Sequence, residues 1–169
     1  MRSSPVVLVG IIALVAGCAG GGLQRSDVED LPAGDAVGTA ASGDYGLELY
    51  TRSCSGTCLV HSGGFTASLC DVGQIDDTTL TVTQQDGALV MQSDGLVLDR
   101  LTGGLDADGT FDVGGWGTQQ GGEVEVEVRS SGTLAGDAFT GTAESRGHGH
   151  VGGEHVDCTA RYDLSGARQ

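Results

Sequence analysis

The clearest pattern in the chain is the alternation Glu123-Val124-Glu125-Val126-Glu127-Val128. Side chains of a β-strand point alternately to opposite faces, so this alternation indicates a strand with one apolar and one polar face. The valines are expected to face a core. The glutamates are expected to form a solvated face that discourages pairing with other sheets.

The same period of two recurs on both sides of this strand. Apolar and polar residues alternate from Tyr45 to Tyr50, around Leu80 and Val82, and from Ala160 to Leu164. Asp-Gly pairs at 86–87, 94–95 and 108–109 are typical of hairpin turns, which need positive φ angles. No segment after the N-terminal apolar run has a helical period. The patterns predict an all-β domain of eight or nine short strands, near 44–53, 65–70, 78–85, 88–93, 96–105, 109–114, 122–130, 133–144 and 156–164.

Strands joined in sequence order by short turns predict an antiparallel up-and-down meander. A meander of this size can remove its exposed edges by closing into a small barrel, and a two-sheet sandwich is the alternative. The pattern resembles lipocalin-like barrels in general outline. A barrel of about eight strands is either filled by its own side chains or holds one small ligand.

Four cysteines after residue 18 indicate two disulfides, because their number is even and their spacing does not fit a zinc site. They are Cys54, Cys58, Cys70 and Cys158. In a closed barrel with an even number of strands, the first and last strands are antiparallel neighbours. The end of the first strand, near Cys54, then lies beside the start of the last, near Cys158. We therefore expect Cys54–Cys158 with Cys58–Cys70; the other two pairings stay open, with Cys54–Cys58 as the main rival.

The N-terminus has the pattern of an export signal. Arg2 precedes an uncharged apolar run from Pro5 to Ala16, which is too short to span a bilayer as a helix. The run ends in Val15-Ala16-Gly17-Cys18, which resembles the lipobox of bacterial lipoproteins. The resemblance implies that residues 1–17 are removed as a signal peptide and that acyl chains on Cys18 attach the protein to a membrane. It also implies a place in the cell envelope, at the outer membrane if the host has one, because Ala19 replaces the Asp of an inner-membrane retention signal.

Composition divides the rest of the chain and limits its partners. Residues 18–42 are predicted to be a disordered tether, since Gly, Ala, Ser and Asp dominate them without an apolar period. Residues 43–169 are then a single all-β domain. The formal net charge of −15 repels nucleic acid and anionic headgroups and favours weak, unspecific cation binding, so no nucleic-acid partner is expected.

Three of the four histidines lie close together, at His148, His150 and His155. Imidazoles at i and i+2 on an extended chain share a face, and nitrogen and oxygen ligands suit zinc or copper. Metal capture by these histidines, completed by Glu154 or Asp157, is therefore one hypothesis. The alternative is a flexible glycine-rich loop with solvated histidines, because glycine raises the entropic cost of holding a metal. No cofactor is expected.

The sequence contains no nucleophile elbow, P-loop or HExxH motif, so we do not expect an enzyme. The lone tryptophan, Trp116, is a candidate for lining a ligand pocket at a barrel mouth, or for plugging the barrel or capping the core. The leading hypothesis is a non-enzymatic envelope lipoprotein whose small barrel serves in binding or in envelope structure. Metal capture, and an enzyme with a site assembled from distant strands, are the alternatives.

Overall fold

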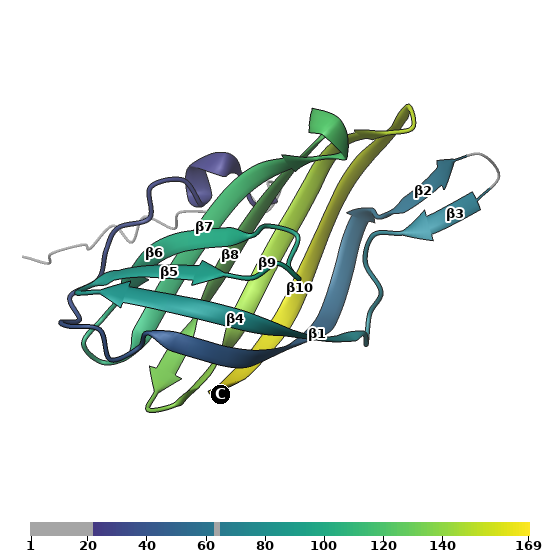
Figure 1. Ribbon diagram of the computed structural model, residues 1–169. Helices are drawn as coiled ribbons and strands as arrows, with labels where there is room; N and C mark the ends of the chain where they lie inside the picture. The colour runs from purple at the N-terminus through teal and green to yellow at the C-terminus, as the bar shows by residue number, and fades with distance from the viewer. Residues whose placement is uncertain (1–21, 63–64) are drawn as a thin grey trace, which may run out of the picture.

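A computed structural model describes residues 22–62 and 65–169 (Figure 1). The predicted signal peptide and Cys18 lie outside the described residues. Within these ranges the secondary structure consists of strands and two short 3₁₀ helices. In chain order the elements are η1 (Arg25–Asp27), β1 (Gly43–Thr57), β2 (Leu59–Ser62), β3 (Phe65–Ser68), β4 (Ile75–Gln85), β5 (Ala88–Gln92), β6 (Arg100–Leu105), β7 (Thr110–Gln119), η2 (Gln120–Gly122), β8 (Val124–Ala135), β9 (Ala138–Val151) and β10 (Glu154–Arg168).

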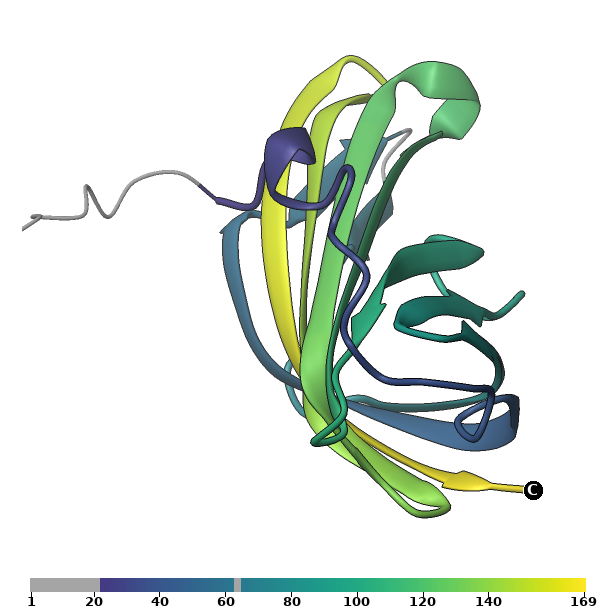
Figure 2. The ribbon, with the colours of Figure 1, turned by 90° about the vertical axis from the view of Figure 1, so that its left-hand side faces the viewer.

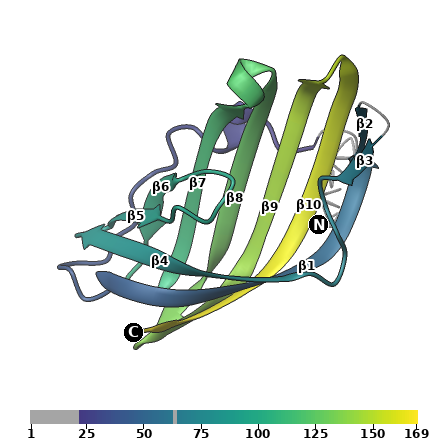
Figure 3. The same ribbon diagram turned by 45° about the vertical axis from the view of Figure 1, so that its right-hand side comes forward.

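Eight of the described strands close into an antiparallel barrel in the order β1-β10-β9-β8-β7-β6-β5-β4 (Figure 3). Strands β4 to β10 pair in sequence order, and β1 closes the barrel by pairing with both β4 and β10. The predicted all-β class and closed up-and-down barrel are therefore confirmed, and the sandwich alternative is wrong. The strand expected over 65–70 is not part of the barrel: it forms β3, which pairs with β2 in a separate hairpin extending away from the barrel (Figure 1).

Aromatic rings fill one part of the barrel. Tyr45, Phe111 and Phe139 are buried and meet edge to face, with ring centroids 5.6 Å apart for Tyr45–Phe139 and 6.2 Å apart for Phe111–Phe139. Glycines on neighbouring strands leave room for these rings. A Cβ atom at Gly132 would lie 2.9 Å from Phe111 Cζ, and one at Gly166 would collide with the Phe139 ring. Part of the high glycine content therefore serves the packing of the core and not only the turns.

Residues 22–42 pack along the outside of the barrel (Figure 2), so the disordered tether predicted over 18–42 is wrong for this part. Val28 is only 2% exposed, and a Cβ atom at Gly114 of β7 would lie 3.0 Å from it. Gly34 donates its N–H to the carbonyl of Gly87 at 2.9 Å. Composition does not reveal this packing, because the segment has no apolar period. Glycines let its backbone approach that of the barrel closely instead.

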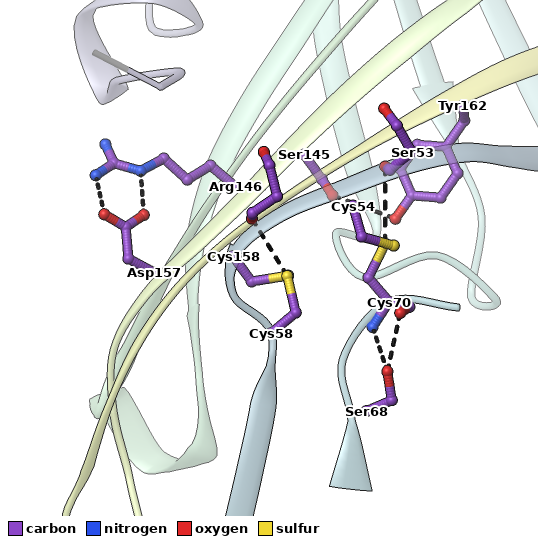
Figure 4. Close-up of a disulfide and its surroundings, with 11 residues drawn as sticks. Ser53, Cys54, Cys58, Ser68, Cys70, Ser145, Arg146, Asp157, Cys158 and Tyr162 are labelled. Carbon is purple, nitrogen blue, oxygen red and sulfur yellow. Dashed lines mark hydrogen bonds and ion pairs between the residues drawn. A yellow bond between two sulfur atoms is a disulfide. The ribbon is translucent and has the colours of Figure 1, made fainter. Parts of the chain in front are cut away.

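The two disulfides join Cys54 to Cys70 and Cys58 to Cys158 (Figure 4). The prediction of two disulfides is confirmed, but the expected pairing of Cys54 with Cys158 and of Cys58 with Cys70 is wrong. The reason is the length of the first strand. Strand β1 continues to Thr57 and does not end near Cys54, so its last residues, and not Cys54, approach the start of β10.

The register of β1 against β10 explains which cysteine reaches the last strand. Gly56 lies opposite Cys158, and Cys58 follows two residues later, just past the strand end. The bond between Cys58 and Cys158 fixes the base of the β2–β3 hairpin at this end of the barrel. There Val60, Val156 and Cys158 form a second, small group of buried residues. The bond between Cys54 and Cys70 closes the same inserted segment from its other side.

Candidate functional site

The inside of the barrel holds a cavity of about 350 Å³ beside the aromatic cluster. Phe139 of that cluster forms part of its wall. Small-molecule sites typically have volumes of roughly 300–1,000 Å³, so the cavity is large enough for a small ligand. Most of the wall is apolar and comes from strands on opposite sides of the barrel: Leu47, Leu49, Leu80, Met91, Val128 and Leu164.

A small number of polar groups interrupt this apolar wall. Ser145 of β9 and Tyr162 of β10 hold their hydroxyl groups 3.3 Å apart, and both line the cavity. Ser130 of β8 adds a third hydroxyl and is buried. Asp76 and Asp77 of β4 line the same cavity but are exposed, so they mark its solvent side. The arrangement is an apolar chamber with hydroxyl groups inside and carboxylates near the entrance.

One wall of the cavity comes from the loop between β5 and β6. Residues 95–98 of this loop line the cavity, and Leu98 is buried against the core. The loop is held by a hydrogen bond between the hydroxyl groups of Thr78 and Ser93, 3.1 Å apart, and by Ser93 N–H donating to the carbonyl of Asp99 at 3.1 Å. It lacks the continuous ladder of hydrogen bonds of the strands around it.

A second cluster of polar residues lies on the outer face of the barrel. Strand β8 carries Glu125 and Glu127 on that face, and β9 places His148 directly opposite Glu125. The Nε2 atom of His148 lies 3.0 Å from Glu127 Oε1. Among the His, Cys, Asp and Glu side chains of the described ranges, these three form a group close enough to share one metal ion. Their ligand atoms all lie within 4.8 Å of one another.

An ion pair borders this outer cluster. Arg146 of β9 donates from Nε and Nη2 to the two carboxylate oxygens of Asp157 on β10, at 2.8 and 2.9 Å (Figure 4). These hydrogen bonds hold the pKa of the Asp157 carboxyl below its usual value, and the positive charge of the guanidinium acts in the same direction. The same bonds raise the pKa of Arg146. The two groups therefore remain charged and paired. Arg146 also lies opposite Glu127 in the register of β8 and β9, and the charge of Glu127 adds to the rise in its pKa.

The structure divides the three histidines that the sequence placed together. They lie on strands β9 and β10, so the expected flexible loop is wrong and only the turn around Gly152 and Gly153 separates the two strands. His150 and His155 are register partners with ring centroids 5.6 Å apart. His148 shares their face of the sheet, but its ring contacts Glu127. A site made of all three histidines is therefore not assembled.

Trp116 lies neither at a barrel mouth nor in the core, so both expectations for it are wrong. It is on the outer face of β7, opposite Glu127 of β8, and is 37% exposed. Arg25 of the N-terminal segment covers it, with Cζ 3.3 Å from the ring centroid. The sequence gives no signal for this contact, because Arg25 lies in the segment whose composition predicts a disordered tether.

Glu127 is the residue whose environment sequence reasoning missed. The valines of its strand face inward and the glutamates outward, as the alternation predicts, but Glu127 is only 1% exposed and not solvated. The N-terminal segment covers this part of the sheet, where Arg146 also donates to the carbonyl of Leu23 at 3.1 Å. Alternation reports the face on which a side chain lies, but not what a distant segment places over it.

No protein-family model matches the chain, and no curated protein is significantly similar to it. No helix among residues 22–62 and 65–169 is long and apolar enough to cross a membrane.

Proposed function

We propose that the protein is a non-enzymatic lipoprotein of the bacterial envelope whose barrel binds one small, mostly apolar molecule. The observation that carries this proposal is the apolar cavity of about 350 Å³ inside the barrel. Burial of apolar surface contributes roughly 25 cal/mol per Å², so such a chamber favours a ligand that fills it with hydrocarbon.

The polar groups of the cavity define the ligand further. The hydroxyl groups of Ser145 and Tyr162 suit a ligand with one hydroxyl or carbonyl group at an otherwise apolar body. Asp76 and Asp77 at the solvent side, together with the net charge of −15, repel anions. The ligand is therefore neutral or cationic.

The chemistry of the cavity also supports a role in binding and not in catalysis. The hydroxyl group of Ser145 meets the phenol of Tyr162, whereas an activated serine needs a general base within hydrogen-bond distance. The lining of the cavity contains no histidine, and its two carboxylates, Asp76 and Asp77, lie on the solvent side.

The anchoring part of the proposal comes from the lipobox pattern that ends at Cys18. Paired cysteines in the barrel support export, because disulfides persist in oxidising compartments outside the cytoplasm. The test is cell fractionation with Cys18→Ser. The unchanged protein is expected in the membrane fraction and the variant in the soluble fraction or retained as the unprocessed precursor. Equal membrane attachment of a processed variant would contradict lipidation at this cysteine.

Ligand binding can be tested on a soluble chain that begins at Ala19 and is exported to the periplasm. Residues 22–169 include the strands of the barrel, its core and the disulfides, so this chain keeps the site. Its emission is measured with the apolar fluorophore N-phenylnaphthylamine. We expect saturable binding that Ser145→Phe abolishes by filling the cavity, while Thr142→Phe, on the outer face of the same strand, leaves it intact. Equal binding by both variants would place the probe outside the cavity.

A further inference from the structure

Three donor atoms converge on the outer face of the barrel, at a place unrelated to the inner cavity. Glu125 and Glu127 lie two residues apart on β8, so both project from the same face. His148 lies opposite Glu125 and within 3.0 Å of Glu127, from Nε2 to Oε1. We refer to Glu125, Glu127 and His148 as the donor group. All its ligand atoms lie within 4.8 Å of one another.

The buried carboxylate of Glu127 is only half satisfied. Its side chain is 1% exposed, and among the described residues its Oε2 atom has no hydrogen-bond partner. Oε1 accepts the contact from His148, so Oε2 is the atom left over. A buried carboxylate oxygen without a partner costs free energy, and such groups are normally paired or coordinate a metal. The orphaned oxygen lies in the donor group, where an ion would satisfy it.

The charges around the donor group leave the two glutamates without an arginine partner. Arg25 is paired with Glu29 at 2.8 Å, and Arg146 with Asp157 at 2.8 Å. In the described part of the chain, neither glutamate of the donor group forms an ion pair with arginine. Both arginines are bound to other carboxylates, so their charges offset those of Glu125 and Glu127 only in part. A divalent cation would compensate the negative charge that is left.

We propose that Glu125, Glu127 and His148 bind one divalent transition-metal ion, of which Zn²⁺ is the test ion. One imidazole nitrogen and carboxylate oxygens are zinc ligands, whereas Mg²⁺ and Ca²⁺ prefer oxygen alone. Three protein ligands leave a coordination position for water, because zinc is usually four-coordinate. His148 is 35% exposed in its side chain, so the ion enters from the solvent side of the cluster while Glu127 holds it from beneath.

The test is titration of Zn²⁺ into the soluble chain from Ala19, followed by calorimetry. In this chain all four cysteines are in disulfides, so no thiolate competes for the ion. We expect one ion per chain, with affinity lowered about tenfold or more by Glu127→Gln and by His148→Ala. Glu123→Gln and His150→Ala are matched controls, because both residues are exposed: Glu123 directly precedes β8, and His150 lies on β9 on the same face as His148. They are expected to leave the affinity unchanged.

Thermal unfolding separates loss of the metal from loss of the fold. Gln keeps the shape of Glu127 and its contact with His148 but removes the buried charge. Without metal, Glu127→Gln is therefore expected to unfold at the same temperature as the unchanged chain or higher. Zn²⁺ is expected to raise the melting temperature of the unchanged chain and not that of the variant. Trp116, opposite Glu127, supplies a second signal, because Zn²⁺ is expected to change its emission.

Three results would overturn the proposal. One is a Glu127→Gln chain that is less stable without metal and still binds Zn²⁺, because Glu127 would then be structural. The other is loss of binding in His150→Ala and His155→Ala with no effect of His148→Ala, because the pair with ring centroids 5.6 Å apart would then be the site. Absence of Zn²⁺ binding to the unchanged chain also contradicts it.

Discussion

Cys58 is bonded to Cys158 across the seam where the first strand of the barrel meets the last. Their separation in sequence is 100 residues, against 16 for Cys54 and Cys70. The long link therefore holds together two parts of the chain that are far apart when it is unfolded, and it also fixes the inserted β2–β3 hairpin.

Removal of the long disulfide is expected to destabilise the protein more than removal of the short one. The chain-entropy model gives about 4.7 kcal/mol for a loop of 100 residues and about 3 kcal/mol for one of 15 residues. Cys58→Ser with Cys158→Ser should thus lower the free energy of unfolding in urea more than Cys54→Ser with Cys70→Ser. The reverse order would contradict the pairing, as would a peptide map that links Cys54 to Cys158.

Truncation of Val28 is expected to destabilise the barrel, although the residue precedes every strand. Its side chain is 2% exposed against β7, and burial of a valine contributes roughly 1.5–3 kcal/mol. We expect Val28→Ala to lower the free energy of unfolding by about 1–2 kcal/mol. Val37→Ala is the control, because Val37 is 83% exposed and should change stability by less than about 0.5 kcal/mol. Equal effects would mean that the segment is not docked in solution.

Addition of a methyl group at Gly132 is expected to disturb the aromatic core. A Cβ atom there would lie 2.9 Å from Phe111 Cζ and 2.7 Å from Gly141 Cα. Overpacking of this kind costs about 1–3 kcal/mol, so Gly132→Ala should lower the melting temperature. Gly147→Ala is the control, since a Cβ atom there would lie at an ordinary 3.7 Å from Val124 Cγ1. A Gly132→Ala variant with an unchanged melting temperature would argue against the packing of these rings.

The strand pattern was predictable because its cause is local. Alternation places Val124 and Val126 in the core whatever the rest of the chain does, and strands linked in sequence order form a meander. The disulfide pairing was not predictable, because it depends on where β1 ends. Because β1 extends to Thr57, Cys54 lies opposite Ala160, and Cys58, just past the strand end, reaches Cys158.

The outer cluster was only partly predictable. The i, i+2 spacing correctly placed His148 and His150 on one face of an extended strand. The partner of His148 could not be predicted, because Glu127 is on another strand and its register is set by the hairpin between β8 and β9. Burial of Glu127 depends on the N-terminal segment, whose composition is that of a linker.

Stability is expected to depend on pH through Asp157. Its pKa is lowered in the folded protein by hydrogen bonds from Arg146, whereas in the unfolded chain it has an ordinary value of about 3.9. The pair therefore stabilises the fold above that value, and the contribution is lost as the pH falls through the lower folded pKa. Because Asp157 is 43% exposed, the contribution is at most about 1 kcal/mol.

The variant Asp157→Asn should then be less stable than the unchanged chain at pH 7. The difference should begin to shrink as the pH falls below about 4 and disappear as the pH falls through the lower folded pKa. Urea unfolding across this range measures it. Asp71→Asn, at an exposed position, is the control. A difference that stays constant into acid would mean that the ion pair does not carry it.

Native mass spectrometry of the soluble chain from Ala19, purified from the periplasm, tests the binding function most directly. We predict that the oxidised chain carries one small apolar molecule that is lost on denaturation, and that Ser145→Phe arrives without it while Thr142→Phe retains it. An oxidised chain that carries nothing, and that takes up no N-phenylnaphthylamine when the probe is added, would contradict a ligand-binding barrel.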